Sequence, residues 1–265
     1  MPQAPQAQAP LTIQDGVATV VLASTPPQGA LSLDNLRSMR DVARQLHERS
    51  DLRAVVLTGS ANRFCAGMDV SVLAASRDAS LLQRRQWVRL GPEMCDAWAA
   101  LEVPTIAAIE GACVGGGLAL ALACDFRVLS DRASLRLPEV PLGMNMSWHT
   151  LPRLVALVGP ARAKRIAMAG EALDAATAAQ WGLADHVVSA EQALPRAQAW
   201  AQTLAALPPV AVRMTKESIN AIAQALAPLA SHMDRDQFLL TQDSEDLREG
   251  IQAWQHKRPP QFQGR

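Results

Sequence analysis

Tyrosine is absent from the 265 residues, and aromatic side chains make up only 4% of the chain. Proton transfer must therefore depend on Asp, Glu, His, Cys or Lys, because the phenol that often serves as an acid or hydrogen-bond donor is missing. The sequence has no dense block of Lys or Arg, and its formal net charge is zero. This balance argues against nucleic acid or an anionic membrane surface as the main partner.

Cysteine and long apolar runs are also scarce. The four cysteines follow neither a Cys-x-x-Cys pattern nor a Cys/His ligand spacing, which is typical of reduced thiols and predicts no metal site (Cys65, Cys95, Cys113 and Cys124). No apolar run is long enough to span a membrane, and residues 1–10 lack the basic start and apolar core of a signal peptide. We therefore expect a cytoplasmic protein with no membrane span and a disordered tail at residues 1–10.

The glycine-rich segments lack the patterns that bind phosphates or carry a nucleophilic serine, namely G-x-G-x-x-G, G-K-[ST] and G-x-S-x-G. Instead, three consecutive glycines (115–117) connect an apolar strand at 106–109 to an Ala/Leu-rich helix that ends near Asp125. Glycines cost backbone entropy at a helix start, where the first N–H groups have no partner in the helix. They either present these groups to an electron-rich atom or only permit tight packing of the helix against the strand.

Residues 55–69 have the same order of apolar strand, small-residue turn and helix. In α/β sheets, ligands bind at the carboxyl ends of such strands. If the two turns face each other, each contributes one backbone N–H, and the pair binds a carbonyl oxygen more tightly as it gains negative charge. The two segments together predict an oxyanion hole.

Strand and helix patterns alternate through the first two-thirds of the chain, and helical patterns fill the last third. This order predicts an α/β core at residues 11–190 and a helical C-terminal region at 191–265. The expected elements include a β-hairpin at 11–22, strands at 54–58, 126–129 and 185–188, a short helix near 70–75 and a long helix at 80–101.

Three segments resemble, in order, the signatures of the crotonase superfamily, the enoyl-CoA hydratases and isomerases. They are F-C-A-G-M-D at 64–69, E-G-A-C-V-G-G-G at 110–117 with C-D at 124–125, and P-E-V-P-L-G at 138–143. The resemblance extends from about residue 11 to the end of the chain. It implies a crotonase-like superhelix of ββα units whose C-terminal helices form a homotrimer or a dimer of trimers. It also implies a coenzyme A thioester as substrate, with no separate cofactor.

The resemblance also assigns roles to residues. The backbone N–H groups of Ala66 and Gly116 would hold the thioester carbonyl and stabilise its enolate, and Glu139 would be the acid/base. The acyl-CoA would run along a path that includes Ala66, Gly67, Met68, Asp69, Gly116 and Ala30. The acyl pocket would include Ala119, Leu142 and Met144.

Ala119 departs from the hydratases of the family, which carry one glutamate at this position and a second at the position of Glu139. Addition of water uses one group to orient the water and another to move its proton. A single carboxylate can move a proton from C2 to C4 of an acyl chain, so Ala119 favours Δ3–Δ2 enoyl-CoA isomerisation over hydration. Acyl-CoA decarboxylation, thioester hydrolysis and acyl-CoA binding without catalysis remain alternatives.

Glu139 lies among apolar residues and prolines, a setting that would raise its pKa and suit a proton shuttle. The alternative is a glutamate on a surface loop. The large side chains of 144–149 (M-N-M-S-W-H) would narrow or reshape the acyl pocket, and His149 is a further candidate for a second acid–base group. Lower-ranked candidates are Asp69, Glu93, Asp96 and His186.

Overall fold

Two β-sheets organise the fold in a computed structural model, which describes residues 9–22, 29–69, 71–72 and 79–265. The larger sheet has the strand order β1 (Leu11–Gln14), β2 (Val17–Val21), β3 (Ala54–Thr58), β5 (Thr105–Ile109), β7 (Phe126–Ser130), β10 (His186–Val188). The smaller sheet has the order β4 (Arg63–Cys65), β6 (Ala112–Val114), β8 (Ser134–Arg136), β9 (Leu173–Asp174).

The chain passes from the larger sheet to the smaller one three times, from β3 to β4, from β5 to β6 and from β7 to β8. The β1–β2 hairpin is antiparallel, whereas the pairs β2–β3, β3–β5, β5–β7 and β7–β10 are parallel. This repeated passage confirms the predicted α/β superhelix of ββα units. It also brings the ends of β4 and β6, and hence the two small-residue turns, to one sheet.

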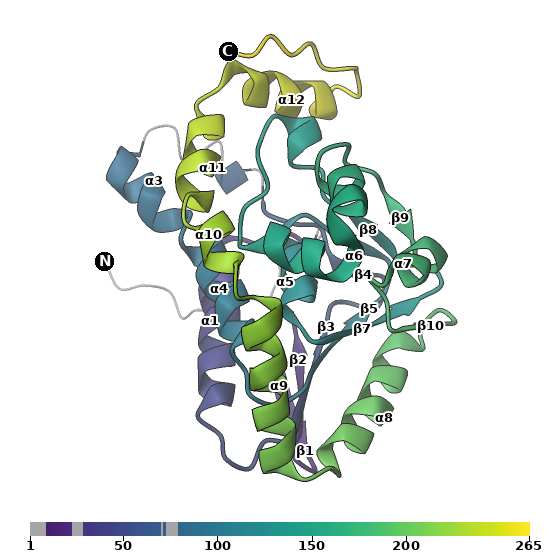
Figure 1. Cartoon of the computed structure of the whole chain (residues 1–265). Coiled ribbons are helices and arrows are strands. Elements are labelled where there is room, and N and C mark those ends of the chain that lie inside the picture. The colour runs from purple at the N-terminus through teal and green to yellow at the C-terminus, as the bar shows by residue number, and fades with distance from the viewer. Residues whose placement is uncertain (1–8, 23–28, 70, 73–78) are drawn as a thin grey trace.

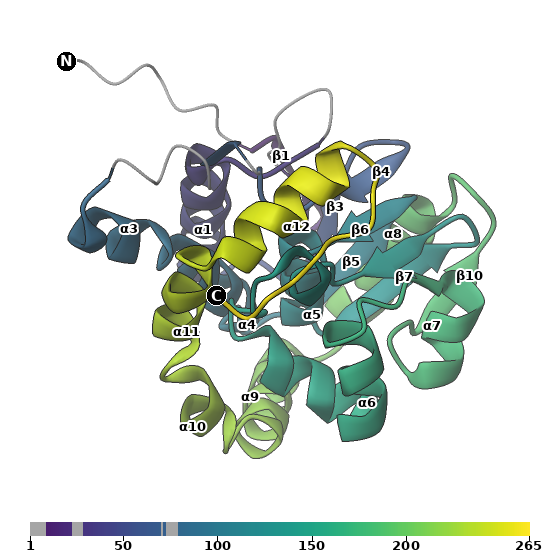
Figure 2. The same cartoon turned by 90° about the horizontal axis from the view of Figure 1, so that it is seen from above.

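The larger sheet is covered on both faces because its strands alternate between two apolar clusters. In β5, Ala107 and Ile109 face the main core, whereas Ile106 and Ala108 face a second cluster under α8 (Ala193–Ala205). The main core includes α1 (Leu33–His47), α4 (Leu90–Ala99) and α5 (Gly116–Ala123) (Figures 1 and 2). Such burial on both faces explains why β3 and β5 are buried along their whole length and are apolar except for one threonine each.

Two long helical segments of the chain are each divided in the structure. The long helix expected at 80–101 is two helices, α3 (Leu81–Trp87) and α4. Pro92 accounts for the break because its ring clashes with the carbonyl of Val88, one turn earlier. α6 (Thr150–Ala167) is likewise divided into two helical segments at Gly159, whose φ of 74° and ψ of 165° are not helical. The short helix near 70–75 lies largely outside the described residues.

The helical C-terminal region that the sequence predicted at residues 191–265 begins with α8. α8 packs directly on β2, β3, β5 and β7 and therefore belongs to the core. The following helices are α9 (Pro209–Ala223), α10 (Ala227–Ser231), α11 (Asp234–Gln242) and α12 (Glu245–Gln255), whereas α7 (Ala175–Trp181) precedes α8. α11 and α12 lie across the core near α3 and the turn after Glu139 (Figures 1 and 2).

The end of the expected disordered tail is part of the fold. Ala9 is buried and its N–H donates to Oγ of Ser38, and the carbonyl of Pro10 accepts from Val21. Residues 1–8 of that expected tail lie outside the described residues. Among the described helices, none is both long and apolar enough to cross a membrane.

Candidate active site

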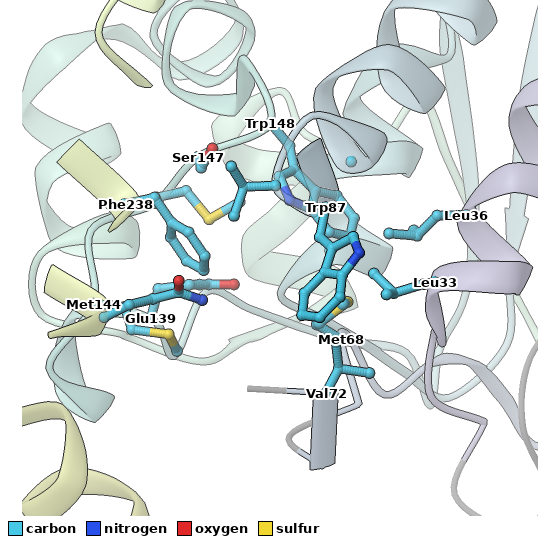
Figure 3. A pocket seen from close by; sticks show the side chains of 15 residues that line it. Leu33, Leu36, Met68, Val72, Trp87, Glu139, Met144, Ser147, Trp148 and Phe238 are labelled. Atoms are coloured by element: carbon cyan, nitrogen blue, oxygen red, sulfur yellow. The ribbon is translucent and has the colours of Figure 1, made fainter. Parts of the chain in front are cut away.

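A narrow cavity of about 80 Å³ lies where both glycine turns meet the segment that follows β8. It is lined by Met68 from the first turn, Gly116 from the second, and Glu139. Figure 3 shows Glu139, Met144 and Phe238 on one side and Met68, Leu33 and Trp87 on the other. The fold therefore brings together Met68 and Glu139, which are 71 positions apart in the chain and were both expected in the site.

The two turns are in direct backbone contact. A Cβ on Gly67 would lie 3.0 Å from the carbonyl oxygen of Val114 and 3.7 Å from Cα of Gly115. Gly67 has a φ of 91° and Gly115 a φ of 53°, which glycine adopts far more readily than other residues. The predicted meeting of the two turns is thus present in the structure.

Gly116 is the first residue of α5, so its N–H has no acceptor in a preceding helical turn. The first intrahelical bond comes from Ala119 N–H to the Gly115 carbonyl, at 3.0 Å. No hydrogen bond joins the Gly116 N–H to another described residue. Because the helix dipole adds positive potential at this end, the Gly116 N–H can bind an oxygen that carries negative charge.

In the first turn, the structure favours a different N–H from the one expected. The Ala66 N–H already donates to the Gly29 carbonyl at 2.9 Å, so it is occupied. Leu31 donates to the Gly67 carbonyl and accepts from Asp69 N–H, which leaves the N–H of Met68, between them, directed away from Leu31. Met68 lines the cavity and its N–H has no acceptor among the described residues.

Glu139 is half-buried as a residue, but the Oε2 atom of its carboxyl is fully buried and faces the cavity wall, so the carboxyl is not that of an open surface loop. Burial raises the pKa of its carboxyl to about 7. Its Oε2 atom has no hydrogen-bond partner among the described residues, and Oε1 lies against Gly115, where a Cβ would be 2.7 Å away. A carboxyl near half-protonation at neutral pH can both take and return a proton.

The backbone of Glu139 is held by the turn that follows it, a 3-10 helix η2 (Val140–Leu142). The Glu139 carbonyl accepts from Leu142 N–H at 3.0 Å and from Met144 N–H at 2.9 Å. α12 supports this turn from behind, since a Cβ on Gly250 would overlap the Leu142 carbonyl. The close approach explains why residue 250 is a glycine.

Each of the three consecutive glycines is required by a different neighbour. A side chain at Gly115 would meet Glu139, one at Gly116 would overlap the indole of Trp148, and one at Gly117 would overlap Cβ of Cys65. Only the contact of Gly117 with Cys65 is close packing of the helix against a strand, which was the alternative explanation for the glycines. The first two belong to the cavity.

α11 contributes two cavity residues that the sequence did not indicate, Phe238 and Gln242. The Oε1 atom of Gln242 is buried without a partner among the described residues. The end of α11 is fixed to the Glu139 segment, because Asn145 N–H and Thr241 Oγ1 lie 3.4 Å apart and the Thr241 hydroxyl donates to Oδ1 of Asn145 at 3.0 Å. No sequence periodicity could show this contact, which joins segments about 100 residues apart.

Several expected site residues do not line the cavity. Met144 does, whereas Leu142 and Ala119 do not, and Ala119 is fully buried in the main core. Ala30 lies on the segment that pairs with Met68, and its side chain is likewise outside the cavity wall. Asp69 accepts from Ser71 N–H at 2.9 Å and so has the role of a helix cap.

The other acid–base candidates have structural partners outside the cavity. His149 lies 3.0 Å from Oδ1 of Asp96 through Nδ1, and Arg153 donates to the same oxygen at 2.8 Å. Glu93 pairs with Arg40 and Arg89, and His186 contacts Arg196 and Trp200. Burial raises the pKa of Cys65 to about 12 and that of Cys113 well above its ordinary value, so neither is an activated thiol.

Comparison with known proteins accords with this geometry. The family described as Enoyl-CoA hydratase/isomerase matches residues 12–265. The chain belongs to the enoyl-CoA hydratase/isomerase family. It is 32% identical to the putative enoyl-CoA hydratase/isomerase YngF of Bacillus subtilis over 249 residues, 94% of this chain and 95% of that protein. It is 30% identical to the crotonyl-CoA hydratase of Syntrophomonas wolfei over 250 residues, again 94% and 95%.

Solved structures of this enoyl-CoA hydratase/isomerase family have the same fold. The enoyl-CoA hydratase from Mycobacterium avium subsp. paratuberculosis superposes with a TM-score of 0.87 at 26% identity, over 98% of this chain and all of that one. The predicted superfamily and fold are therefore confirmed, and the protein is an enzyme of this family. The relatives' names include both hydratase and isomerase, so the reaction must be argued from the residues of this chain.

Proposed function

We propose that this enzyme binds an acyl-CoA thioester with its carbonyl oxygen between the N–H groups of Gly116 and Met68. Both N–H groups lack an acceptor among the described residues, and both residues line the cavity. Hydrogen bonds from two fixed donors are worth most when the oxygen becomes an enolate, which lowers the barrier to removing a proton from C2. Gly116 was expected in this role, and Met68 takes the place of Ala66.

We further propose that Glu139 carries the proton. The observation that carries this proposal is its buried carboxyl with a pKa of about 7, located against Gly115 beside the enolate site. In the ionised form the carboxylate removes a proton from C2 of a 3-enoyl-CoA, and the electrons move into the conjugated enolate. The protonated carboxyl then returns the proton to C4, which leaves a 2-enoyl-CoA and restores the carboxylate.

Isomerisation fits the site better than hydration. Glu139 is the sole carboxylate among the described residues that line the cavity. The position at which hydratases of the family carry a second glutamate is Ala119, whose methyl group is part of the apolar core. The site therefore has a group that can shuttle one proton, and it lacks a second carboxylate to orient a water.

The decisive experiment compares cis-3-enoyl-CoA with trans-2-enoyl-CoA as substrates of the wild type and of Glu139→Gln. We expect the wild type to convert the 3-enoyl-CoA and the variant to lose this activity. Faster hydration of the 2-enoyl-CoA would overturn isomerisation as the main reaction. Isomerisation that survives Glu139→Gln would overturn the role of Glu139. Turnover of a malonyl-type thioester alone would favour decarboxylation, and tight binding without any turnover would favour a non-catalytic protein.

We also propose that the enzyme is a homo-oligomer, a trimer or a dimer of trimers, assembled in part through α9. No described side chain of α9 is classed as buried, and Val210, Met214 and Ile222 are each more than 60% exposed. A cavity of about 620 Å³ separates α9 from α5, α6 and α8. An apolar helix that stands off its own core is typical of an interface between subunits.

A further inference from the structure

Trp148 packs its indole flat against the backbone of two glycines, Gly91 in α4 and Gly116 in α5. A Cβ at either glycine would overlap the indole ring. The contact places a large apolar side chain against Gly116, the residue whose N–H is available for a substrate oxygen, and both residues line the cavity. An acyl chain that leaves a carbonyl bound at Gly116 must therefore pass beside Trp148.

The backbone at this point has an uncommon conformation. Trp148 has a φ of 66° and His149 a φ of 54°, and neither is a glycine. Left-handed conformations are rare for bulky residues and persist where the surrounding structure holds them. These two consecutive residues lie directly before α6, and the indole of Trp148 contacts Gly91 of α4 and Gly116 of α5.

A polar network holds this turn, in which Arg153 and Asp234 are buried and Asp96 is partly exposed. Nη1 of Arg153 donates to the carbonyls of both Trp148 and His149, each at 3.2 Å. Nη2 of Arg153 donates to Asp96, which also pairs with the His149 ring. The N–H of His149 donates to Oδ2 of Asp234 on α11 at 2.9 Å. The turn is thus fixed from α4, α6 and α11, so the indole is a rigid wall.

The cavity that remains is small. Its volume is about 80 Å³, whereas a cavity of roughly 150 Å³ in another protein accommodates benzene, a ligand with six carbons. We propose that Trp148 closes the acyl pocket and restricts the enzyme to short acyl chains. This inference rests on the proposed function, because it requires the thioester carbonyl to bind at Gly116.

Binding of saturated acyl-CoAs tests the inference without any turnover. Butyryl-CoA and decanoyl-CoA are titrated calorimetrically against the wild type, Trp148→Ala and Gly91→Ala. The wild type is expected to bind butyryl-CoA at least about tenfold more tightly than decanoyl-CoA, since each badly placed methylene costs about tenfold or more. The ratio of the Kd for decanoyl-CoA to the Kd for butyryl-CoA measures this preference. Both variants are expected to reduce the ratio about tenfold or more, because Trp148→Ala removes the indole and Gly91→Ala displaces it.

Gly91→Ala keeps the inference testable if Trp148→Ala does not fold, because alanine favours the helix in which Gly91 lies. Trp254→Ala is the matched control, since Trp254 is 62% exposed on α12 and outside the cavity. This control should keep the wild-type ratio. Equal or tighter binding of decanoyl-CoA by the wild type, or an unchanged ratio in Gly91→Ala, would overturn the inference while the proposed function stands. No binding of either ligand by the wild type would overturn the proposed function as well.

Discussion

The carboxyl of Glu139 lies against Gly115 so closely that a side chain at position 115 would displace it. Oε1 of Glu139 would lie 2.7 Å from a Cβ at this position, and Gly115 has a φ of 53°. The glycine therefore determines where the carboxyl of the proposed proton carrier lies. The contact joins two of the three segments that resemble the family.

The first prediction concerns Gly115→Ala. The new methyl group must push the Glu139 carboxyl away, and a displacement of about 1 Å in a catalytic group can lower the rate about 100-fold. We expect a loss of this order in kcat for 3-enoyl-CoA isomerisation, measured by steady-state kinetics. Gly159→Ala is the matched control, because Gly159 also has a positive φ, 74°, but has no atom within 4 Å of a Cβ. A wild-type kcat in Gly115→Ala would contradict the role of this contact.

The second prediction is a pH profile. Because Glu139 must be ionised to remove a proton and its pKa is about 7, kcat/KM should rise about tenfold per pH unit below pH 7 and level off above it. Glu139→Gln should lower kcat by a factor of about 100 to 10,000 and abolish this rise. The measurement is the initial rate from pH 5 to 9. A nearly flat profile over this range would show that the pKa of the carboxyl is not raised.

The third prediction concerns stability. The pKa of Glu139 is about 7 in the folded protein and near 4.5 in the unfolded chain, so the folded state binds more protons between these values. This contribution is fully present below about pH 4.5 and is lost as the pH rises to about 7. The loss is roughly 3 kcal/mol, at about 1.4 kcal/mol per pKa unit.

Glu139→Gln removes the titrating group and so isolates this effect. Relative to the wild type, the variant should gain roughly 3 kcal/mol in the free energy of unfolding between pH 4.5 and pH 8. Urea titrations at a fixed protein concentration measure the difference, because association of subunits would otherwise shift the apparent stability. An equal difference at both pH values would exclude a raised pKa in the folded state.

The sequence could predict the parts of the site that depend on local backbone chemistry. The three glycines at the start of α5 and the apolar surroundings of Glu139 both indicated a site at the position where the structure has the cavity. The sequence could not show whether the N–H of Ala66 or that of Met68 is available to a substrate, because this depends on which N–H pairs with the Gly29–Leu31 segment. This pairing lies between segments far apart in the chain and leaves no periodic pattern.

The closing of the cavity was predictable only in outline. The large side chains at 144–149 indicated a narrowed pocket, but the left-handed turn that aims Trp148 at Gly116 depends on Asp96, Arg153 and Asp234 from three different helices. Likewise, the resemblance to the family implied one oligomerisation region for the C-terminal helices. Their separate roles, with α8 on the sheet and Gln242 at the cavity, follow from tertiary packing.

The fourth prediction concerns Glu110, a second buried carboxylate, which we expect to stabilise the fold and to take no part in catalysis. Oε1 of Glu110 accepts from the N–H of Ala193 at the start of α8, at 3.0 Å, and Glu110 does not line the cavity. Glu110→Ala would leave this buried N–H without a partner, which should lower the free energy of unfolding by about 1–3 kcal/mol. kcat should be unchanged. Glu110→Gln keeps an acceptor oxygen and should restore most of the stability, whereas a large loss of kcat in either variant would assign Glu110 to the reaction.

The fifth prediction tests assembly through α9. Met214 is 63% exposed and Ile222 80% exposed, and a charge on either would have to be buried without a partner in an interface. The double variant Met214→Glu/Ile222→Glu should therefore have a smaller mass by light scattering than the wild type, with an unchanged far-UV circular dichroism spectrum. Met168→Glu places the same charge at an equally exposed apolar position, 62%, just after α6. If the double variant keeps the wild-type mass, α9 is not the interface, because an interface could not accommodate two unpaired carboxylates at these positions.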